Sequence, residues 1–323
     1  MSGKLTAKWP NEGTVSMERD VPIIDFHAHL RGDAPVRLPE PQSGVYIKEI
    51  AELMEPLTRQ VAGICGMHFR DPFSRFLYRS INHYAFHEIL RVFEKYDVKL
   101  LLDSMAQGGI AHTVVCPMEP YFSSDDVAAA IAPYPDRFSL FLSADPQKPD
   151  ALEAFEGQLR RHRAAGLKLN PARAGSPAEE RRMWELMALA QEKDLPVFIH
   201  TGSFPFEANR YNDPGALAPV VAAFPHLSVT LAHIGWDQYP AILALAERYH
   251  HLSVETSWQP PKVIRQAVDK LGAHRVLMGS DFPLLQQSVA IDTLRSALNP
   301  SEFKLVASRN AERLLGVKLG APV

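Results

Sequence analysis

The chain has 323 residues and a formal net charge of -3, with 46% hydrophobic and 22% charged residues. This composition is typical of a soluble globular protein and argues against a disordered or fibrous chain. The length allows either two ordinary domains or one α/β barrel. No basic run is present, so a nucleic-acid partner is not expected and a small molecule is the expected partner.

The cysteines and the hydropathy pattern bear on the compartment. Cys65 and Cys116 are the only two cysteines, and they lie far apart without a CxxC motif, which predicts a reducing compartment and no disulfide. Residues 1–20 form an N-terminal extension without the apolar core of a signal peptide, and no apolar run reaches membrane-spanning length. We therefore expect a cytoplasmic protein with no membrane partner, for which a homodimer remains an option.

The first predicted strand covers residues 21–30 and ends in two alternating histidines, His27 and His29. Because every second side chain on a strand points to the same side, both imidazoles would project together in a metal-chelating geometry. By itself this spacing is weak evidence for a metal site.

The stretch from residue 31 to about 110 holds no convincing strand. Residues 46–57 and 81–96 have helical patterns, and three prolines lie between positions 35 and 41. A connection of this length in a compact domain usually carries function or structure of its own. We expect residues 31–80 to be an insertion that caps a pocket.

From residue 112 onward, short apolar runs alternate with helical patterns. The strands predicted after the first are residues 112–117, 138–144, 166–170, 196–200, 228–233, 252–256 and 275–281. Strands that alternate with helices imply parallel pairing through right-handed crossovers, and eight such units close into a (β/α)8, or TIM, barrel. We predict this α/β fold as one domain over residues 21–323. A doubly wound open sheet is the alternative, but its dinucleotide-binding form lacks support because no GxGxxG follows the first strand.

Two of the predicted helices have a clear apolar face. The residues that mark these faces are Met183, Leu186, Met187 and Ala190 in one helix, and Ile242, Leu245 and Tyr249 in the other. Their spacing of three and four residues is that of one side of a helix packed on a core.

Polar residues recur where predicted strands end, at His200, His233 and Asp281. In a parallel barrel these ends open on one face, where such enzymes keep their active sites. Imidazole and carboxylate are the ligands that zinc prefers when one position stays open for water. We predict a divalent metal, most simply Zn2+, held by His27, His29, His200 and Asp281, with a bound water that the metal acidifies. His233 would then be the catalytic acid or base, and Asp281 would also take part in catalysis.

These motifs resemble the amidohydrolase superfamily of metal-dependent barrels. The resemblance includes the sequence GSDFP at residues 279–283 and NAERLLG at residues 310–316, which is similar to the helix that closes such barrels. It spans roughly residues 21 to 316, and the chain is most similar to the amidohydrolase-related subgroup that contains aminocarboxymuconate-semialdehyde decarboxylase. The resemblance implies one zinc or manganese ion at the four ligands above, with His233 as the catalytic histidine.

Lys168 keeps the number of metals open, because it lies on the predicted fourth strand. The binuclear branch of the superfamily carries a carbamylated lysine near this place, which bridges two metals. A lysine that contacts the substrate or a neighbouring carboxylate needs no second metal. The surrounding pattern resembles the mononuclear subgroup, so we expect one metal and no carbamate.

Residues just beyond the strand ends and in the insertion are candidates for binding the substrate. The candidates for contact with it are Arg70, Arg173, Trp236 and Trp258. Arginine offers a fork for a carboxylate and tryptophan a flat apolar wall, so a carboxylated or cyclic organic molecule is expected. Hydrolysis by a metal-activated water is the favoured reaction, and non-oxidative decarboxylation of an aromatic or dienoic acid is the alternative. A non-catalytic binding barrel is a third hypothesis, which the complete ligand set disfavours.

Overall fold

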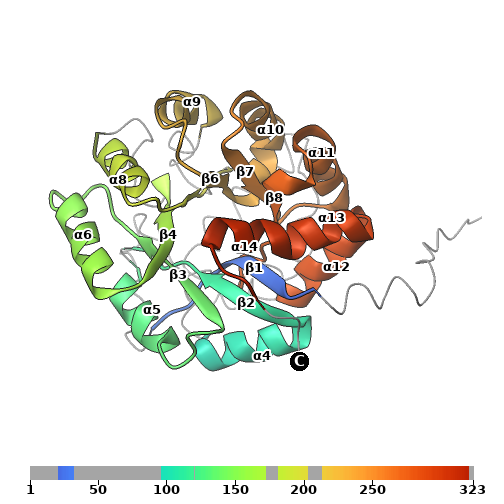
Figure 1. Ribbon diagram of the computed structural model, residues 1–323, viewed down its shortest axis with the longest axis horizontal. Helices are drawn as coiled ribbons and strands as arrows, with labels where there is room; N and C mark the ends of the chain where they lie inside the picture. The colour runs from blue at the N-terminus through green and yellow to red at the C-terminus, as the bar shows by residue number, and fades with distance from the viewer. Residues whose placement is uncertain (1–20, 33–95, 120, 172–180, 203–212, 320–323) are drawn as a thin grey trace, which may run out of the picture.

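The computed structural model describes residues 21–32, 96–119, 121–171, 181–202 and 213–319. This part of the chain contains an eight-stranded parallel sheet (Figure 1). The strands are β1 (Ile23–Ala28), β2 (Ile110–Val115), β3 (Phe138–Ser143), β4 (Ala164–Leu169), β5 (Val197–Ile199), β6 (Val229–Leu231), β7 (Leu252–Glu255) and β8 (Val276–Leu277). Each strand pairs with the next one along the chain (Figure 1). The arrangement is a (β/α)8 barrel, and the predicted fold is confirmed.

The segment after β8 brings the two ends of the sheet together. The amide of Phe26 donates to the carbonyl of Met278 at 2.9 Å, and the amide of Asp281 donates to the carbonyl of His27 at 2.7 Å. Ala28 and Phe282 form a parallel bridge in the same region. This nearly closed seam sets the loop that carries Asp281 directly beside the end of β1.

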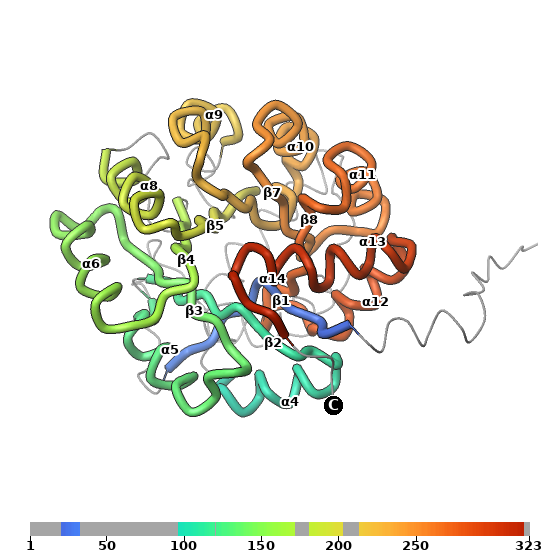
Figure 2. The backbone as a smooth tube through the Cα atoms, viewed as in Figure 1, coloured from blue at the N-terminus to red at the C-terminus, as the bar shows by residue number. Residues whose placement is uncertain are grey.

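Helices surround the strands in both the ribbon and the backbone views (Figures 1 and 2). They are α4 (Val98–Gly108), α5 (Ser124–Ile131), α6 (Ala151–Arg161), α8 (Arg181–Glu192), α9 (Pro214–Ala223), α10 (Tyr239–Arg248), α11 (Pro261–Leu271), α12 (Gln287–Ala297), α13 (Pro300–Lys304) and α14 (Asn310–Leu315). Local sequence sets several of their ends. In α4, for example, the Asp97 side chain accepts from the amide of Leu100, and Gly109 ends the helix with a φ of 64°.

The predicted helical faces are found with one correction. All four residues of the first face are buried on α8. On α10, Ile242 and Leu245 are buried, but Tyr249 follows the helix because its backbone is extended, with φ -118° and ψ 104°.

The strands end earlier than predicted, so His200 and Asp281 lie in the loops just after β5 and β8, and His233 lies in the 3-10 segment η2 (Ala232–Gln238) that follows β6. The backbone explains two of these ends. His233 has a φ of 58° and Asp281 a φ of 60°. A residue in the left-handed region cannot continue a strand, so the chain turns at these positions.

The apolar core has an inner part within the barrel and an outer part under the helices. The rings of Phe26, Phe141 and Phe198 meet edge to face inside the barrel, with Phe26 5.4 Å from Phe141 and 5.5 Å from Phe198 between centroids. Ala311 of α14 packs against this inner cluster, in agreement with the predicted closing helix. The amide nitrogen of Asn310 donates to the carbonyl of Val276 at 2.7 Å, which ties α14 to the start of β8.

Several predictions fall outside the described residues. They concern the extension at 1–20, nearly all of the insertion at 31–80, the helical patterns at 46–57 and 81–95, Cys65, Arg70 and Arg173. Within the described part of the chain, no helix is both long and apolar enough to cross a membrane.

Candidate metal centre

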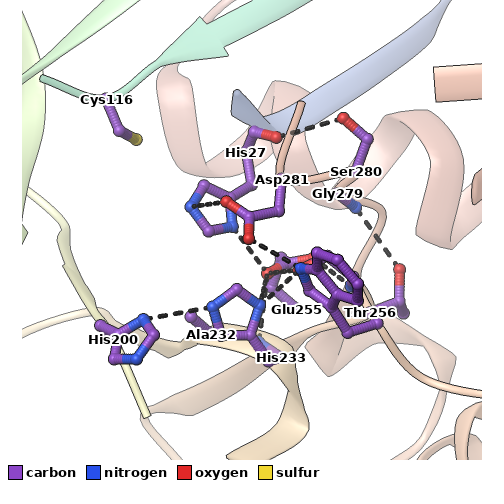
Figure 3. Close-up of polar contacts among 12 residues, drawn as sticks. His27, Cys116, His200, Ala232, His233, Glu255, Thr256, Gly279, Ser280 and Asp281 are labelled. Atoms are coloured by element: carbon purple, nitrogen blue, oxygen red, sulfur yellow. Dashed lines mark hydrogen bonds and ion pairs between the residues drawn. The ribbon is translucent and has the colours of Figure 1, made fainter. Parts of the chain in front are cut away.

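Three of the predicted ligands meet at the seam between β1 and β8. The Nε2 atoms of His27 and His29 are 3.1 Å apart. Oδ1 of Asp281 lies 3.3 Å from Nε2 of His27 and 3.2 Å from Nε2 of His29. All three side chains are buried, and Figure 3 shows His27 and Asp281 facing each other. The arrangement brings two imidazole nitrogens and one carboxylate oxygen to a single point.

Partners behind the two imidazoles fix where their protons lie. Nδ1 of His29 is 2.6 Å from the carbonyl of Cys116, and Nδ1 of His27 is 3.1 Å from Oε2 of Glu255. A carbonyl or carboxylate oxygen only accepts, so both Nδ1 atoms carry the hydrogen and both Nε2 atoms present lone pairs. Three atoms that cannot donate a hydrogen bond to one another therefore meet at this point. Two imidazole nitrogens and one carboxylate oxygen are ligands that fit a divalent cation.

The charges of the site agree with that assignment. Burial lowers the pKa of His27 well below its usual range, and the nearby Lys168 lowers it further, so the imidazole is neutral. Burial alone would raise the pKa of Asp281, but interaction with the protonated forms of His27 and His29 outweighs it and holds that pKa well below its usual range, so the carboxylate is ionised. A neutral imidazole and an ionised carboxylate are the forms that bind a metal.

His200 and His233 form a pair next to this cluster. Nε2 of His233 is 3.2 Å from Nδ1 of His200, and the ring of His233 lies 5.1 Å from the ring of His27 between centroids. Burial lowers the pKa of His233 to about 4, so its imidazole is neutral as well. Figure 3 shows His233 between His200 and Glu255. His200 thus contacts His233 rather than the three atoms described above, and its place as a fourth ligand remains a prediction.

Lys168 of β4 reaches the same interior. Its Nζ is 3.5 Å from Nε2 of His27 and 3.6 Å from the centroid of the Phe198 ring. The side chain is buried, which lowers the pKa of the amine. Within the described residues, no carboxylate lies in ion-pair distance of this amine. Lys168 is therefore next to the proposed ligands, and its amine contacts an imidazole and an aromatic face rather than a neighbouring carboxylate.

The two tryptophans predicted to contact the substrate lie side by side. The rings of Trp236 and Trp258 are 6.1 Å apart between centroids, and both side chains are half-buried. The indole nitrogen of Trp258 also donates to Oδ2 of Asp281 at 2.7 Å. Trp258 thus contacts a proposed ligand directly, a role that its position in the sequence does not reveal.

Glu255 is a site residue that sequence reasoning missed. It is fully buried at the end of β7 and contacts both His27 and His233. The signal was available, because a carboxylate at the carboxyl end of a predicted strand is the same feature that identified Asp281.

Asp25 was also missed, although it lies two residues before His27. It is fully buried, and its oxygens accept from the amide of His27 at 3.0 Å, the hydroxyl of Ser280 at 2.6 Å and the side-chain amide of Gln287 at 2.7 Å. Burial raises its pKa to about 6. Asp25 therefore ties β1 to the loop of Asp281. A buried acid within an apolar strand is the signal that could have identified it.

Comparison with known proteins identifies the family. The amidohydrolase family model matches residues 90–317, which is more than half of the chain. The chain therefore belongs to the amidohydrolase superfamily of enzymes, and the resemblance inferred from its motifs is confirmed. Comparison with curated proteins found no match.

Solved structures share the fold at low sequence identity. An uncharacterised TIM-barrel protein of Bordetella bronchiseptica has a TM-score of 0.68 and 22% identity, covering 92% of this chain and 99% of that chain. A dihydroxybenzoic acid decarboxylase of a Polaromonas species, with bound manganese and 2-nitroresorcinol, has a TM-score of 0.61 and 15% identity, covering 92% and 97%. A probable 2-pyrone-4,6-dicarboxylic acid hydrolase of Acinetobacter baumannii has a TM-score of 0.57 and 13% identity, covering 91% and 99%.

Proposed function

We propose that the protein is a metal-dependent hydrolase that acts on a small carboxylated or cyclic organic substrate. The observation that carries this proposal is the convergence of two unprotonated imidazole nitrogens and one carboxylate oxygen at 3.1 to 3.3 Å. Three lone pairs at this separation repel one another, and a cation bound among them would relieve this repulsion. Membership of the amidohydrolase superfamily supports the same conclusion.

One divalent ion would be held by His27, His29 and Asp281, with His200 as the proposed fourth ligand. Zinc is our first choice for this donor set, and manganese is the alternative because the Polaromonas decarboxylase contains it. When bound, such an ion supplies Lewis acidity and lowers the pKa of a water molecule. Lys168 carries no carbamate in this proposal, since one ion requires no bridging group.

The surrounding residues would orient the substrate and move protons. Asp281 would take the proton of the attacking water, and the neutral ring of His233 would accept that proton in turn and pass it to the leaving group. Trp236 and Trp258 would form an apolar wall for the substrate, and Arg70 and Arg173 would bind its carboxylate.

Decarboxylation is the second candidate. The manganese-containing Polaromonas protein is a decarboxylase, and further structures with this fold carry decarboxylase names. In that reaction a substrate carboxylate would leave as carbon dioxide, and His233 would pass a proton from water to the carbon that carried it. The same residues serve both reactions, so fold alone does not choose between them.

Isotope labelling of the products distinguishes the two reactions. The zinc- or manganese-loaded protein is incubated in 18O-water with a panel of lactones, esters, amides and aromatic or dienoic carboxylic acids. Hydrolysis incorporates one labelled oxygen into the product without release of carbon dioxide, and this is the result that we expect. Release of carbon dioxide from a carboxylic acid would replace the proposal with the second candidate. Turnover that survives His233→Asn would contradict the assigned site.

A further inference from the structure

Glu255 is a buried carboxylate beneath the site that takes no part in the proposed ligand set or proton transfers. Its oxygens are surrounded by donors. Oε2 accepts from Nδ1 of His27 at 3.1 Å, from the backbone amide of His233 at 3.2 Å and from the hydroxyl of Ser257 at 2.8 Å. Oε1 accepts from the backbone amide of Ser257. A carboxylate with this many donors acts only as an acceptor.

The direction of these hydrogen bonds determines the proton position on His233. The hydroxyl of Ser257 has a single hydrogen, which it donates to Glu255. Nδ1 of His233 lies 2.6 Å from the same hydroxyl oxygen, so this oxygen must accept from Nδ1–H. Nε2 of His233 is then the nitrogen with the lone pair. It faces His200, whose Nδ1 is 3.2 Å away.

Hydrogen bonds also fix the backbone around His233. His233 and Ile234 have φ values of 58° and 48°, a conformation that costs free energy outside glycine. The amide of His233 donates to Glu255, and the side-chain amide of Gln259 donates to the carbonyls of His233 and Trp236. These contacts stabilise the strained backbone at His233. The Ser257 hydroxyl then orients the imidazole ring.

We propose that Glu255 and Ser257 are positioning residues that hold His233 in the tautomer with the proton on Nδ1, so that Nε2 is the basic nitrogen. This inference rests on the proposed function, in which His233 transfers a proton. The Glu255 carboxylate also fixes the proton of His27 on Nδ1 and thereby points the Nε2 lone pair of His27 at the proposed metal. One buried acid thus sets the proton positions of a ligand and of the catalytic histidine.

Nitrogen NMR of the full-length, zinc-loaded chain with 15N-labelled histidine tests this inference. The His233 signals are assigned from their absence in His233→Gln. The expected wild-type spectrum has a protonated Nδ1 and an unprotonated Nε2. In Ser257→Ala the Nδ1 atom loses this hydroxyl, and Oε2 of Glu255 is 3.8 Å away, too far for a hydrogen bond. We expect that variant to populate both tautomers and to lose turnover by about 10- to 100-fold.

The chain offers a matched control. The hydroxyl of Ser139 contacts Nε2 of His112 at 2.8 Å, away from the metal ligands. Ser139→Ala removes an equivalent contact and should leave the His233 signals unchanged. A wild-type His233 with its proton on Nε2, or a Ser257→Ala spectrum identical to that of Ser139→Ala, would overturn the inference.

Glu255→Leu, which removes both acceptor oxygens at nearly the same volume, is the second variant, and its folding is checked by circular dichroism. Loss of the carboxylate frees the hydroxyl of Ser257 to donate to His233, so the Nε2–H tautomer should increase. The affinity for zinc should fall by about 10- to 100-fold because His27 loses its acceptor. An unchanged His233 tautomer in this variant would contradict the inference. Failure of the wild-type chain to bind zinc would instead contradict the proposed function, since the tautomer can also be measured without zinc.

Discussion

The indole nitrogen of Trp258 donates a hydrogen bond of 2.7 Å to Oδ2 of Asp281, while Oδ1 of the same carboxylate faces His27 and His29. Trp258 has a φ of 63°, an uncommon backbone conformation for an aromatic residue. The fold therefore accepts local strain to place an N–H donor behind a proposed ligand. Such partners orient ligands and tune their basicity.

Trp258→Phe should keep an aromatic side chain at this position but remove the hydrogen bond to Oδ2 of Asp281. We expect the affinity for a divalent metal to fall by about 10- to 100-fold, as for other losses of a hydrogen bond behind a ligand. Competition with a chelating dye measures this change. Trp184→Phe is the control, because the indole nitrogen of Trp184 is buried without a partner among the described residues. Equal metal affinities for the two variants would show that the Trp258 hydrogen bond has no role at the site.

Asp25 should matter for stability as an acceptor rather than as a charge. Asp25→Ala removes the acceptor of the buried backbone amides of His27 and Ser280, and it leaves the Ser280 hydroxyl and the Gln287 amide only contacts of 3.3 Å. We expect a loss of about 3 kcal/mol or more in the free energy of unfolding. Asp25→Asn should lose much less, because the Gln287 amide can turn its unpartnered Oε1 toward the new NH2 group. Urea denaturation of both variants checks this. Equal losses would contradict it.

The barrel could be predicted from the sequence because its signal is repeated along the chain. Apolar runs such as residues 138–144 and 252–256 alternate with amphipathic segments such as that around Leu186, and both kinds of element are present. The ends of the strands were less predictable. His233 and Asp281 have positive φ values that loop contacts impose, and no local residue preference indicates them.

The candidate site could be predicted only in part. His27, His29 and Asp281 were found because their side chains are of metal-binding types at strand ends, and the structure brings them together. Trp258 and Ser257 could not be found in that way. Their roles depend on contacts across the barrel, to Asp281 and to His233, that only the closed fold creates.

The buried lysine Lys168 should lower the free energy of unfolding of the chain. Its buried amine has only the imidazole of His27 and the ring of Phe198 as close partners among the described residues. Lys168→Met should therefore raise the free energy of unfolding, because burial, which lowers the pKa of this amine, makes its charged form costly in the folded state. Lys270→Met, at an exposed ion pair with Glu247, should change it by less than about 1 kcal/mol. Urea denaturation of both variants measures this difference, and a destabilised Lys168→Met would contradict the prediction.

Substitutions of His233 and Asp281 should affect turnover much more than metal content. His233→Asn and Asp281→Asn should each lower turnover by about 10² to 10⁴, the usual effect of losing a positioned proton-transfer group. Both should retain much of the metal, since the carboxamide in Asp281→Asn would still present an oxygen and His233 is not a proposed ligand. Steady-state kinetics and elemental analysis check this pair of outcomes. Loss of the metal from His233→Asn would make His233 a ligand and would contradict the proposed set.

The metal content of the purified chain tests the central claim most directly. Elemental analysis after growth with zinc and bicarbonate should give close to one divalent ion per chain, and His27→Ala should lose most of it. Two ions per chain, reduced to one by Lys168→Ala, would instead make the site binuclear. A metal-free preparation with full activity would contradict the account.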